Sequence, residues 1–271
     1  VLTWPEGSAW RKRRMAAPLV EGAGGRLRAG RVVQRIEAGR QGVTVDAWDA
    51  ATDTVERWQA INCIVALPVF VAARVVVNPP DFLREAAART RYSPWLVANL
   101  HIERALHDRP GAPPSWDNVL YGSASLGYVD AMHQNLQRVP GATVLTYYLA
   151  LGDAPDNRLR LLQQPWSHWR DTIVAELSVP HPDLREKLRR MDITRYGHAM
   201  AVPVPGTLRN GHFQVRNRLS PASAGHEQLQ EYERLTPSEG RLHFAHSDWS
   251  GYSVFEEAFT RGHAAAVSLR A

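Results

Sequence analysis

Residues 241–269, RLHFAHSDWSGYSVFEEAFTRGHAAAVSL, decide how the rest of this sequence is interpreted. The pattern predicts a short apolar strand over residues 241–245, a polar loop over residues 246–253 and a helix over residues 254–269. This order brings backbone N–H groups and the positive end of a helix to one point. Such a point suits an anion or the electron-rich edge of a reduced cofactor, although an ordinary strand-to-helix turn has the same pattern. The helix also carries small residues that would permit close packing on a sheet, namely Ala258, Gly262, Ala265 and Ala266.

A second informative region lies near the start of the chain. Residues 32–36 form a short apolar strand pattern, and residues 43–47 alternate apolar and polar side chains as a half-buried strand does. Residues 57–67 predict a further strand that ends in the continuous apolar run CIVAL, closed by Pro68. A run of this kind is typical of a strand buried on both faces. The sequence therefore predicts a β-meander whose last strand enters a larger sheet.

The middle of the chain alternates predicted strands and helices. The clearest pattern is residues 95–102, WLVANLHI, a strand with Leu96 and Leu100 on one face and Asn99 and His101 on the other. Residues 211–240 are polar and lack periodicity, so we interpret them as an insertion or a mobile segment. Further strands are predicted over residues 119–122, 127–132 and 143–151, and helices over residues 8–17, 69–76, 80–90, 166–177 and 182–190.

Length and composition indicate a globular protein with a real core. The chain has 271 residues, of which 44% are hydrophobic and 22% charged, and these values exclude disordered and fibrous classes. Cys63 is the single cysteine, which excludes internal disulfides and multi-cysteine metal sites. The longest apolar runs, such as residues 64–70, are far too short to span a membrane.

The basic net charge of +5 does not by itself identify a partner. The 32 basic residues are scattered among 27 acidic ones, and the single dense run, residues 11–14, is more typical of a solvated helix face. A nucleic-acid or anionic-surface binder stays open as a third class on this charge alone, but we predict no nucleic-acid partner. His243, His246 and Asp248 are a conceivable metal set, yet the two imidazoles would point to opposite faces of a strand. We therefore predict no metal site.

The two informative regions, taken in order, resemble the flavin-containing amine oxidase family. That family ends with a strand, Phe-Ala-Gly-(Glu/Thr)-(Glu/Asp), a loop, Glu-Gly-Ala and a helix with Gly-x-x-Ala-Ala. Residues 244–248 (FAHSD), 256–258 (EEA) and 262–265 (GHAA) follow this pattern, with His246 and Glu257 in place of two glycines. Val33-x-x-Ile36, Gly42-Val43-x-Val45 and Ile64-Val65-Ala66-Leu67-Pro68 are similar to the central segment of the family.

The resemblance implies a fold class and an activity. The fold would be α/β (α+β), with an incomplete glutathione-reductase-like FAD domain at residues 1–89 and 241–271. An antiparallel or mixed-sheet substrate domain would occupy residues 90–210. The activity would be that of an FAD-dependent oxidoreductase that oxidises a C–N or C–C bond by hydride transfer to flavin N5, with a small molecule, possibly an amine, as substrate.

The resemblance also carries cofactor contacts onto this sequence. The backbone of Val33 would meet the adenine, and Leu67 with Pro68 would lie near the isoalloxazine. Asp248 would take the acidic position near the ribityl chain and the phosphates. The start of the last helix would offer backbone N–H groups to the pyrimidine end of the flavin, from Phe255 and Glu256.

Three residues are the catalytic candidates. Many amine oxidases place a lysine on the first long strand of the substrate domain, where it holds a water at flavin N5, and the matching position here is Asn99. An asparagine can position a water but cannot act as a charged partner. Trp249 and Tyr252 are the local candidates for the aromatic pair that flanks the amine. A desaturation or another dehydrogenation is therefore an alternative to amine oxidation.

The largest departure from the family is a missing motif. The Rossmann-like dinucleotide-binding fingerprint Gly-x-Gly-x-x-Gly does not occur, because residues 22–25 (GAGG) lack the spacing and follow no strand. We therefore predict that this chain is a C-terminal portion that holds FAD poorly by itself. The alternative is a flavin-free, substrate-binding remnant without catalysis of its own. No signal peptide is recognised in the sequence, so the predicted location is the cytoplasm, for a chain whose true N-terminus is expected upstream. The sequence predicts no particular oligomeric state.

Overall fold

The computed structural model describes residues 8–20, 26–108, 111, 115–135, 139–204 and 237–269. The chain forms two compact units. Unit 1 contains Val1–Leu27 and Tyr92–Ala199, and unit 2 contains Arg28–Arg91 and Met200–Ala271. The predicted domain limits, after residues 89, 210 and 240, stay a prediction. Within the described residues, no helix is both long and apolar enough to cross a membrane.

Unit 1 is built on a five-stranded sheet in the order β6-β7-β8-β5-β9. The β5–β8, β8–β7 and β7–β6 pairs are antiparallel. Gly127 has a positive φ of 88°, and a Cβ there would lie 1.8 Å from the Asn118 carbonyl oxygen, so only glycine lets β6 approach β7. The strands are β5 (Arg91–Ile102), β6 (Asp117–Asn118), β7 (Gly127–Asp130), β8 (Thr143–Ala150) and β9 (Leu188–Val202).

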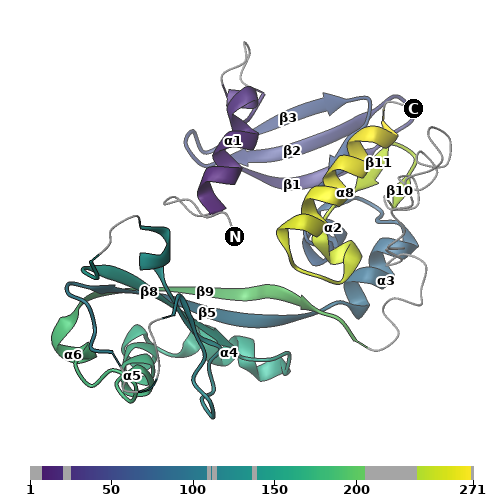
Figure 1. The fold of residues 1–271 in the computed structure, drawn as a ribbon. Helices are drawn as coiled ribbons and strands as arrows, with labels where there is room; N and C mark the ends of the chain where they lie inside the picture. The colour runs from purple at the N-terminus through teal and green to yellow at the C-terminus, as the bar shows by residue number, and fades with distance from the viewer. Residues whose placement is uncertain are drawn as a thin grey trace, which may run out of the picture. The chain divides into compact units, whose positions relative to one another are not determined.

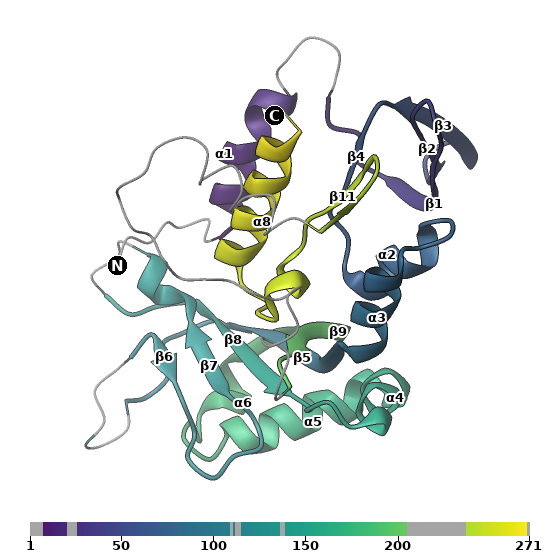
Figure 2. The ribbon, with the colours of Figure 1, turned by 90° about the vertical axis from the view of Figure 1, so that its right-hand side faces the viewer.

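One face of this sheet is the core of unit 1. Burial alternates along β5 as the sequence predicts, so that Leu96, Ala98, Leu100 and Ile102 are buried. Helices cover that face (Figure 2): α4 (Pro155–Gln163), α5 (Trp166–Leu177) and α6 (Leu184–Lys187). The apolar core consists of Leu96, Ala98, Leu100, Ile102, Tyr128, Leu145, Tyr147, Leu149, Leu161, Trp169, Ile173, Val174, Leu177, Leu184 and Met191.

The opposite face of the sheet carries the half-buried side chains of β5 and β8. Trp95, Val97, Asn99 and His101 alternate with the core residues of β5. Their cross-strand partners on β8 are Ala150, Tyr148, Thr146 and Val144 in the same order. We call this set of eight residues the open face of unit 1.

Unit 2 begins with an antiparallel meander in the order β1-β2-β3 (Figure 1). The register of β1 against β2 shifts between Val33 and Arg35, which marks a β-bulge. At the far end of β1, Ile36 forms a parallel bridge to Val76. The strands are β1 (Arg31–Ala38), β2 (Val43–Asp49) and β3 (Thr54–Ala60).

A second small sheet lies between the meander and the C-terminal helix of unit 2 (Figure 2). Its order is β10-β11-β4, in which β11 pairs parallel with β4 and antiparallel with β10. Its strands are β4 (Cys63–Val65), β10 (Ser238–Glu239) and β11 (Leu242–Phe244). Among the described residues, the remaining helices are α1 (Ser8–Val20), α2 (Val69–Val75), α3 (Asp81–Arg89), η1 (Ala131–Gln134), η3 (Ser247–Ser250) and α8 (Phe255–Ser268).

Several predicted elements need correction. The strand predicted over residues 57–67 is two strands in two different sheets, because the chain turns after Ala60. The strand predicted over residues 119–122 is wrong, and β6 lies two residues earlier instead. The helix predicted over residues 182–190 ends at Lys187, where β9 begins. Most of the predicted insertion, residues 211–236, lies outside the described residues.

The packing predicted for the last helix is confirmed only in part. Of the predicted small-residue face, Ala265 is buried and Gly262 is half-buried, but Ala258 and Ala266 are exposed. The buried stripe of α8 is displaced from the predicted face and includes the charged Arg261 together with Ala264 and Ala265.

Candidate functional site

The corner between β4 and α2 holds two of the predicted cofactor residues, Leu67 and Pro68. Both side chains are half-buried. Pro68 precedes the first turn of α2 and has no hydroxyl or carboxylate with which to cap it. The buried N–H of Val69 donates instead to Asp248 Oδ2 at 3.0 Å, across 179 residues of sequence. One hydrogen bond thus joins the corner to the turn that follows β11.

Asp248 is turned into the protein. Its residue is 1% exposed, and its Oδ1 lies 3.2 Å from His246 Nδ1. The same Nδ1 is 3.1 Å from the Asp248 backbone nitrogen, so the imidazole caps the start of η3. His246 stands where the resemblance expects a glycine, and here its ring supports the turn that carries the aspartate.

Arg261 fixes the other end of that turn. Its guanidinium is buried and donates from Nε to Ser250 Oγ at 2.9 Å and from Nη2 to the Trp249 carbonyl oxygen at 2.9 Å. Burial lowers the pKa of Arg261 to about 10, against the opposing effect of Glu257, and the side chain stays charged at neutral pH. We call the residues held in this way, 67–69 and 247–251, the corner–turn pair.

The two aromatic candidates, Trp249 and Tyr252, differ in their exposure to solvent. Trp249 is 1% exposed, and its ring centroid lies 6.0 Å from those of Phe82 and Phe244. Tyr252 is 49% exposed, just before the first turn of α8. Trp249 is thus part of the core of unit 2, whereas Tyr252 can be reached from outside.

The first turn of α8 lies at the surface of unit 2. Phe255 and Glu256 occupy its first turn and are exposed. Val254 precedes them and has no side-chain oxygen to cap the helix. First-turn N–H groups of a helix have no acceptor within their own helix, so such an end can donate hydrogen bonds to other groups. Val33, the predicted adenine contact, lies beside the bulge of β1 and is half-buried.

In unit 1, Asn99 lies at the centre of the open face. Its direct partner across the sheet is Thr146, whose Oγ1 donates to Asn99 Oδ1 at 2.9 Å. His101 is the next residue on the same face, and its Nε2 lies 3.0 Å from Asp192 Oδ2. Arg190 and then His101 lower the pKa of Asp192. Sequence reasoning missed this histidine–aspartate pair, because β9, which carries Asp192, was predicted in part as helix.

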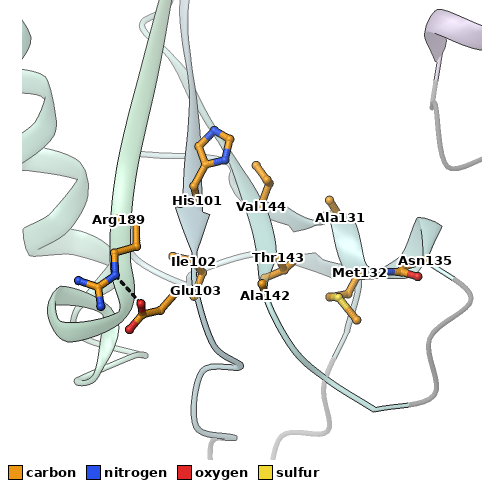
Figure 3. Close-up of a pocket in the computed structure, with 10 residues that line it drawn as sticks. All are labelled: His101, Ile102, Glu103, Ala131, Met132, Asn135, Ala142, Thr143, Val144 and Arg189. Carbon is orange, nitrogen blue, oxygen red and sulfur yellow. Dashed lines mark hydrogen bonds and ion pairs between the residues drawn. The ribbon is translucent and has the colours of Figure 1, made fainter.

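A shallow cavity of about 450 Å³ continues the open face beyond His101 (Figure 3). Val144, the partner of His101, and Met132 contribute apolar wall. An ion pair of Arg189 with Glu103 borders it, drawn as a dashed line in Figure 3. The full lining is His101, Ile102, Glu103, Ala131, Met132, Asn135, Ala142, Thr143, Val144 and Arg189.

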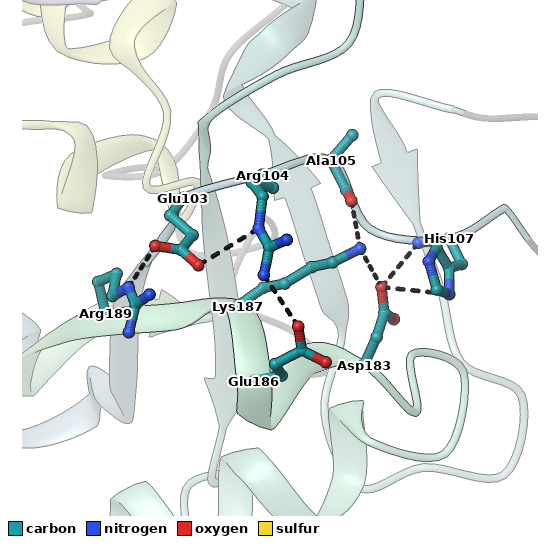
Figure 4. A network of polar contacts seen from close by, with 8 residues as sticks. All are labelled: Glu103, Arg104, Ala105, His107, Asp183, Glu186, Lys187 and Arg189. Carbon is teal, nitrogen blue, oxygen red and sulfur yellow. Dashed lines mark hydrogen bonds and ion pairs between the residues drawn. The ribbon is translucent and has the colours of Figure 1, made fainter.

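A buried ion pair between Lys187 and Asp183 holds the chain segment that follows β5 (Figure 4). Lys187 Nζ is 2.5 Å from Asp183 Oδ2 and 2.6 Å from the Ala105 carbonyl oxygen, and both side chains are 8% exposed. Burial alone would raise the pKa of Asp183, but the Lys187 ammonium and the His107 N–H hold it below its usual value. The arrangement is that of a structural clamp.

The structure brings some predicted site residues together and leaves others apart. Pro68 and Asp248 meet through Val69 in unit 2, next to Trp249, whereas Asn99 belongs to unit 1. Cys63 is half-buried, and desolvation raises the pKa of its thiol. Among the described residues, no group of three or more His, Cys, Asp or Glu side chains could hold a metal ion.

These features define a mixed helix-and-sheet protein in which one hydrogen bond, from Val69 to Asp248, joins a strand-to-helix corner to the turn that precedes the last helix. Comparison with known proteins then gives the family. The model of the flavin-containing amine oxidoreductase family matches residues 6–270. The chain belongs to this family, which confirms the resemblance read from the two sequence regions and the flavin as the cofactor of the family.

Solved structures agree at the level of the fold. A cyclohexylamine oxidase from Brevibacterium oxydans IH-35A is 17% identical, with a TM-score of 0.59 over 97% of this chain and 52% of that one. A putrescine oxidase bound to putrescine is 16% identical, with a TM-score of 0.65 over 98% of this chain and 53% of that one. This chain therefore spans about half the length of these structures. No curated protein matches the sequence.

Proposed function

We propose that this chain is part of an FAD-dependent amine oxidoreductase that oxidises a C–N bond, or a C–C bond, of a small substrate. The observation that carries the proposal is the hydrogen bond from Val69 to Asp248, because it joins the two segments on which the family resemblance rests. Amine oxidase neighbours with the same fold support it.

The residues of unit 2 fit a flavin. Leu67 and Pro68 offer an apolar corner, and the first turn of α8, at Phe255 and Glu256, offers backbone N–H groups to a carbonyl-bearing ring. Val33 offers backbone groups beside a bulge. FAD, when bound, supplies the acceptor for the hydride of the substrate. Asp248 serves this site by holding the corner against the turn, since its carboxylate lies inside the protein.

The residues of unit 1 that act on the substrate would be those of the open face. Asn99 has no charge, so it would orient a water or a neutral amine by hydrogen bonding and would not form an ion pair. Tyr252, exposed beside α8, is the aromatic candidate that a substrate can reach, whereas Trp249 lies in the core of unit 2. Because the structural neighbours are a cyclohexylamine oxidase and a putrescine oxidase, small alkylamines and diamines are the substrates to test first.

The domain organisation is part of the same proposal. Residues 1–89 and 241–271 would form part of a glutathione-reductase-like FAD domain, and residues 90–210 the substrate domain. The chain spans about half the length of its structural neighbours and contains no Gly-x-Gly-x-x-Gly. It would therefore work with a dinucleotide-binding unit that this sequence does not include. The alternative is a remnant that binds substrate without flavin.

The test is a visible absorbance spectrum of the purified chain before and after incubation with FAD and desalting. We expect little flavin to remain with the chain alone and stoichiometric flavin when a dinucleotide-binding unit is supplied. Anaerobic addition of amines should then bleach the flavin band. Tight retention of FAD by the chain alone would refute the proposal that its FAD domain is incomplete. A bound flavin that is reduced neither by amines nor by substrates for C–C bond oxidation would refute the proposed oxidoreductase activity.

A further inference from the structure

The side-chain amide of Asn99 is held by one neighbour on the open face. Thr146 is its direct cross-strand partner, and the Thr146 hydroxyl donates to Asn99 Oδ1 at 2.9 Å. Both side chains are half-buried, so water competes with this bond less than it would at a fully exposed site. Thr146 is also β-branched, and its χ1 is therefore stiff.

The orientation of an asparagine amide decides its chemistry. Its two ends have nearly the same shape, but one oxygen accepts hydrogen bonds and one nitrogen donates two. A hydrogen-bond donor placed beside the oxygen therefore fixes the orientation of the amide and leaves the nitrogen on the opposite side. With Oδ1 occupied by the threonine hydroxyl, the Nδ2 group of Asn99 is the end left to act on other molecules.

We propose that Thr146 is a positioning residue, which orients the Asn99 amide so that Nδ2 is the hydrogen-bond donor presented by the open face to a water or a neutral substrate amine. This inference rests on the proposed function for its consequence in catalysis. Its geometric part concerns two residues of unit 1 and needs no cofactor. The two parts can therefore be tested separately.

The first experiment uses the 271-residue chain, labelled with ¹⁵N, and follows the side-chain amide signals of Asn99 by NMR. Asn99→Asp identifies the signals by removing them. Thr146→Val keeps the shape of the side chain and removes its hydroxyl, whereas Thr146→Ser keeps the hydroxyl. We expect Thr146→Val to shift the Asn99 amide pair, because the carbonyl oxygen of that amide loses its hydrogen-bond donor, and Thr146→Ser to restore the wild-type signals. Unchanged Asn99 signals in Thr146→Val, with normal thermal unfolding, would overturn the proposal.

The second experiment uses the FAD-loaded enzyme that contains this chain and measures the rate constant of flavin reduction by an amine under anaerobic conditions. Thr146→Val should lower that rate constant about tenfold and leave the apparent substrate affinity within about twofold, whereas Thr146→Ser should stay near wild type. In an Asn99→Ala background, Thr146→Val should have no further effect, because the two residues act as one unit. The same loss in both backgrounds would overturn the proposal.

The outcomes distinguish this inference from the proposed function. If no amine reduces the flavin of the wild-type enzyme, the proposed function fails, and the NMR measurement still decides whether Thr146 orients Asn99. If amines reduce the flavin but Thr146→Val does not slow the reaction, the proposed function stands and the role of Thr146 is refuted.

Discussion

The two units of this molecule are stabilised in different ways. In unit 1, one continuous apolar core lies between a five-stranded sheet and the helices that cover it. In unit 2, β4 and β11 have three residues each, and the predicted site segments are joined by polar contacts of Asp248 and Arg261. Short parallel strands normally belong to larger sheets that are covered on both faces. Unit 2 has buried apolar side chains as well, Phe244 and Trp249 among them. Its site segments differ from unit 1 because single hydrogen bonds, such as that from Val69 to Asp248, join stretches that are far apart in sequence.

The largest effect is expected in the core of unit 1. Trp169 of α5 is 1% exposed within that core, and Trp169→Ala should lower the free energy of unfolding by about 3–5 kcal/mol. Trp166→Ala, three residues earlier in the same helix, is the matched control, because Trp166 is 48% exposed. Urea unfolding followed by circular dichroism measures both. Equal losses in the two variants would contradict the view that unit 1 depends on this core.

A second effect concerns the polar clamp of unit 1. Lys187→Ala leaves the Asp183 carboxylate buried without its cation and should cost about 3 kcal/mol. Arg104→Ala breaks the exposed pair with Glu186 and should change stability by less than about 0.5 kcal/mol. Because the pKa of Asp183 is held low, the contribution of the clamp should be present at neutral pH and disappear below about pH 4. A Lys187→Ala variant as stable as Arg104→Ala would show that the clamp does not stabilise unit 1.

The elements that could be predicted from the sequence are those with a local pattern. The alternation of residues 95–102 gave β5 and its two faces, because period two is a direct consequence of strand geometry. The strand and the helix predicted within residues 241–269 were also confirmed, because each has its own local pattern in the sequence. The family resemblance depended on these regions and was confirmed as well.

The remaining features depend on partners distant in sequence. β9 shows no regular alternation, and its strand form arises from pairing beside β5. The inward direction of Asp248 depends on Val69, 179 residues away, and no local signal reports it. The central position of Arg261 in the buried stripe of α8 was missed, because a charged residue at helical spacing predicts an exposed side. The roles predicted for Asn99, Trp249 and Tyr252 stay predictions.

A third, smaller effect tests the corner–turn pair of unit 2. Asp248→Ala leaves the buried N–H of Val69 without its acceptor and should cost about 1–2 kcal/mol, whereas Asp248→Asn keeps an oxygen there and should cost less. Hydrogen exchange at the Val69 amide should speed up in Asp248→Ala, while exchange in α5 of unit 1 stays unchanged. Asp81→Ala, at the exposed start of α3, is the control. Unchanged hydrogen exchange at the Val69 amide would show that Asp248 does not stabilise the corner at residues 67–69.

The smallest effect is a pH dependence confined to unit 2. Desolvation lowers the pKa of His243 on β11 below its ordinary value of 6.5. The unfolded chain therefore binds a proton at this residue at a higher pH than the folded chain does, and stability is lost as the pH falls below about 6.5. Between pH 7.5 and 5.5 the loss should stay below about 1 kcal/mol, because the side chain is only partly buried. His243→Gln should flatten this part of the curve, measured as exchange of the β4 and β11 amides at the two pH values. If amide exchange depends on pH as steeply in His243→Gln as in the wild type, the acid sensitivity of unit 2 comes from another group. The difference between the two units would then depend on the contacts of Asp248 and Arg261 alone.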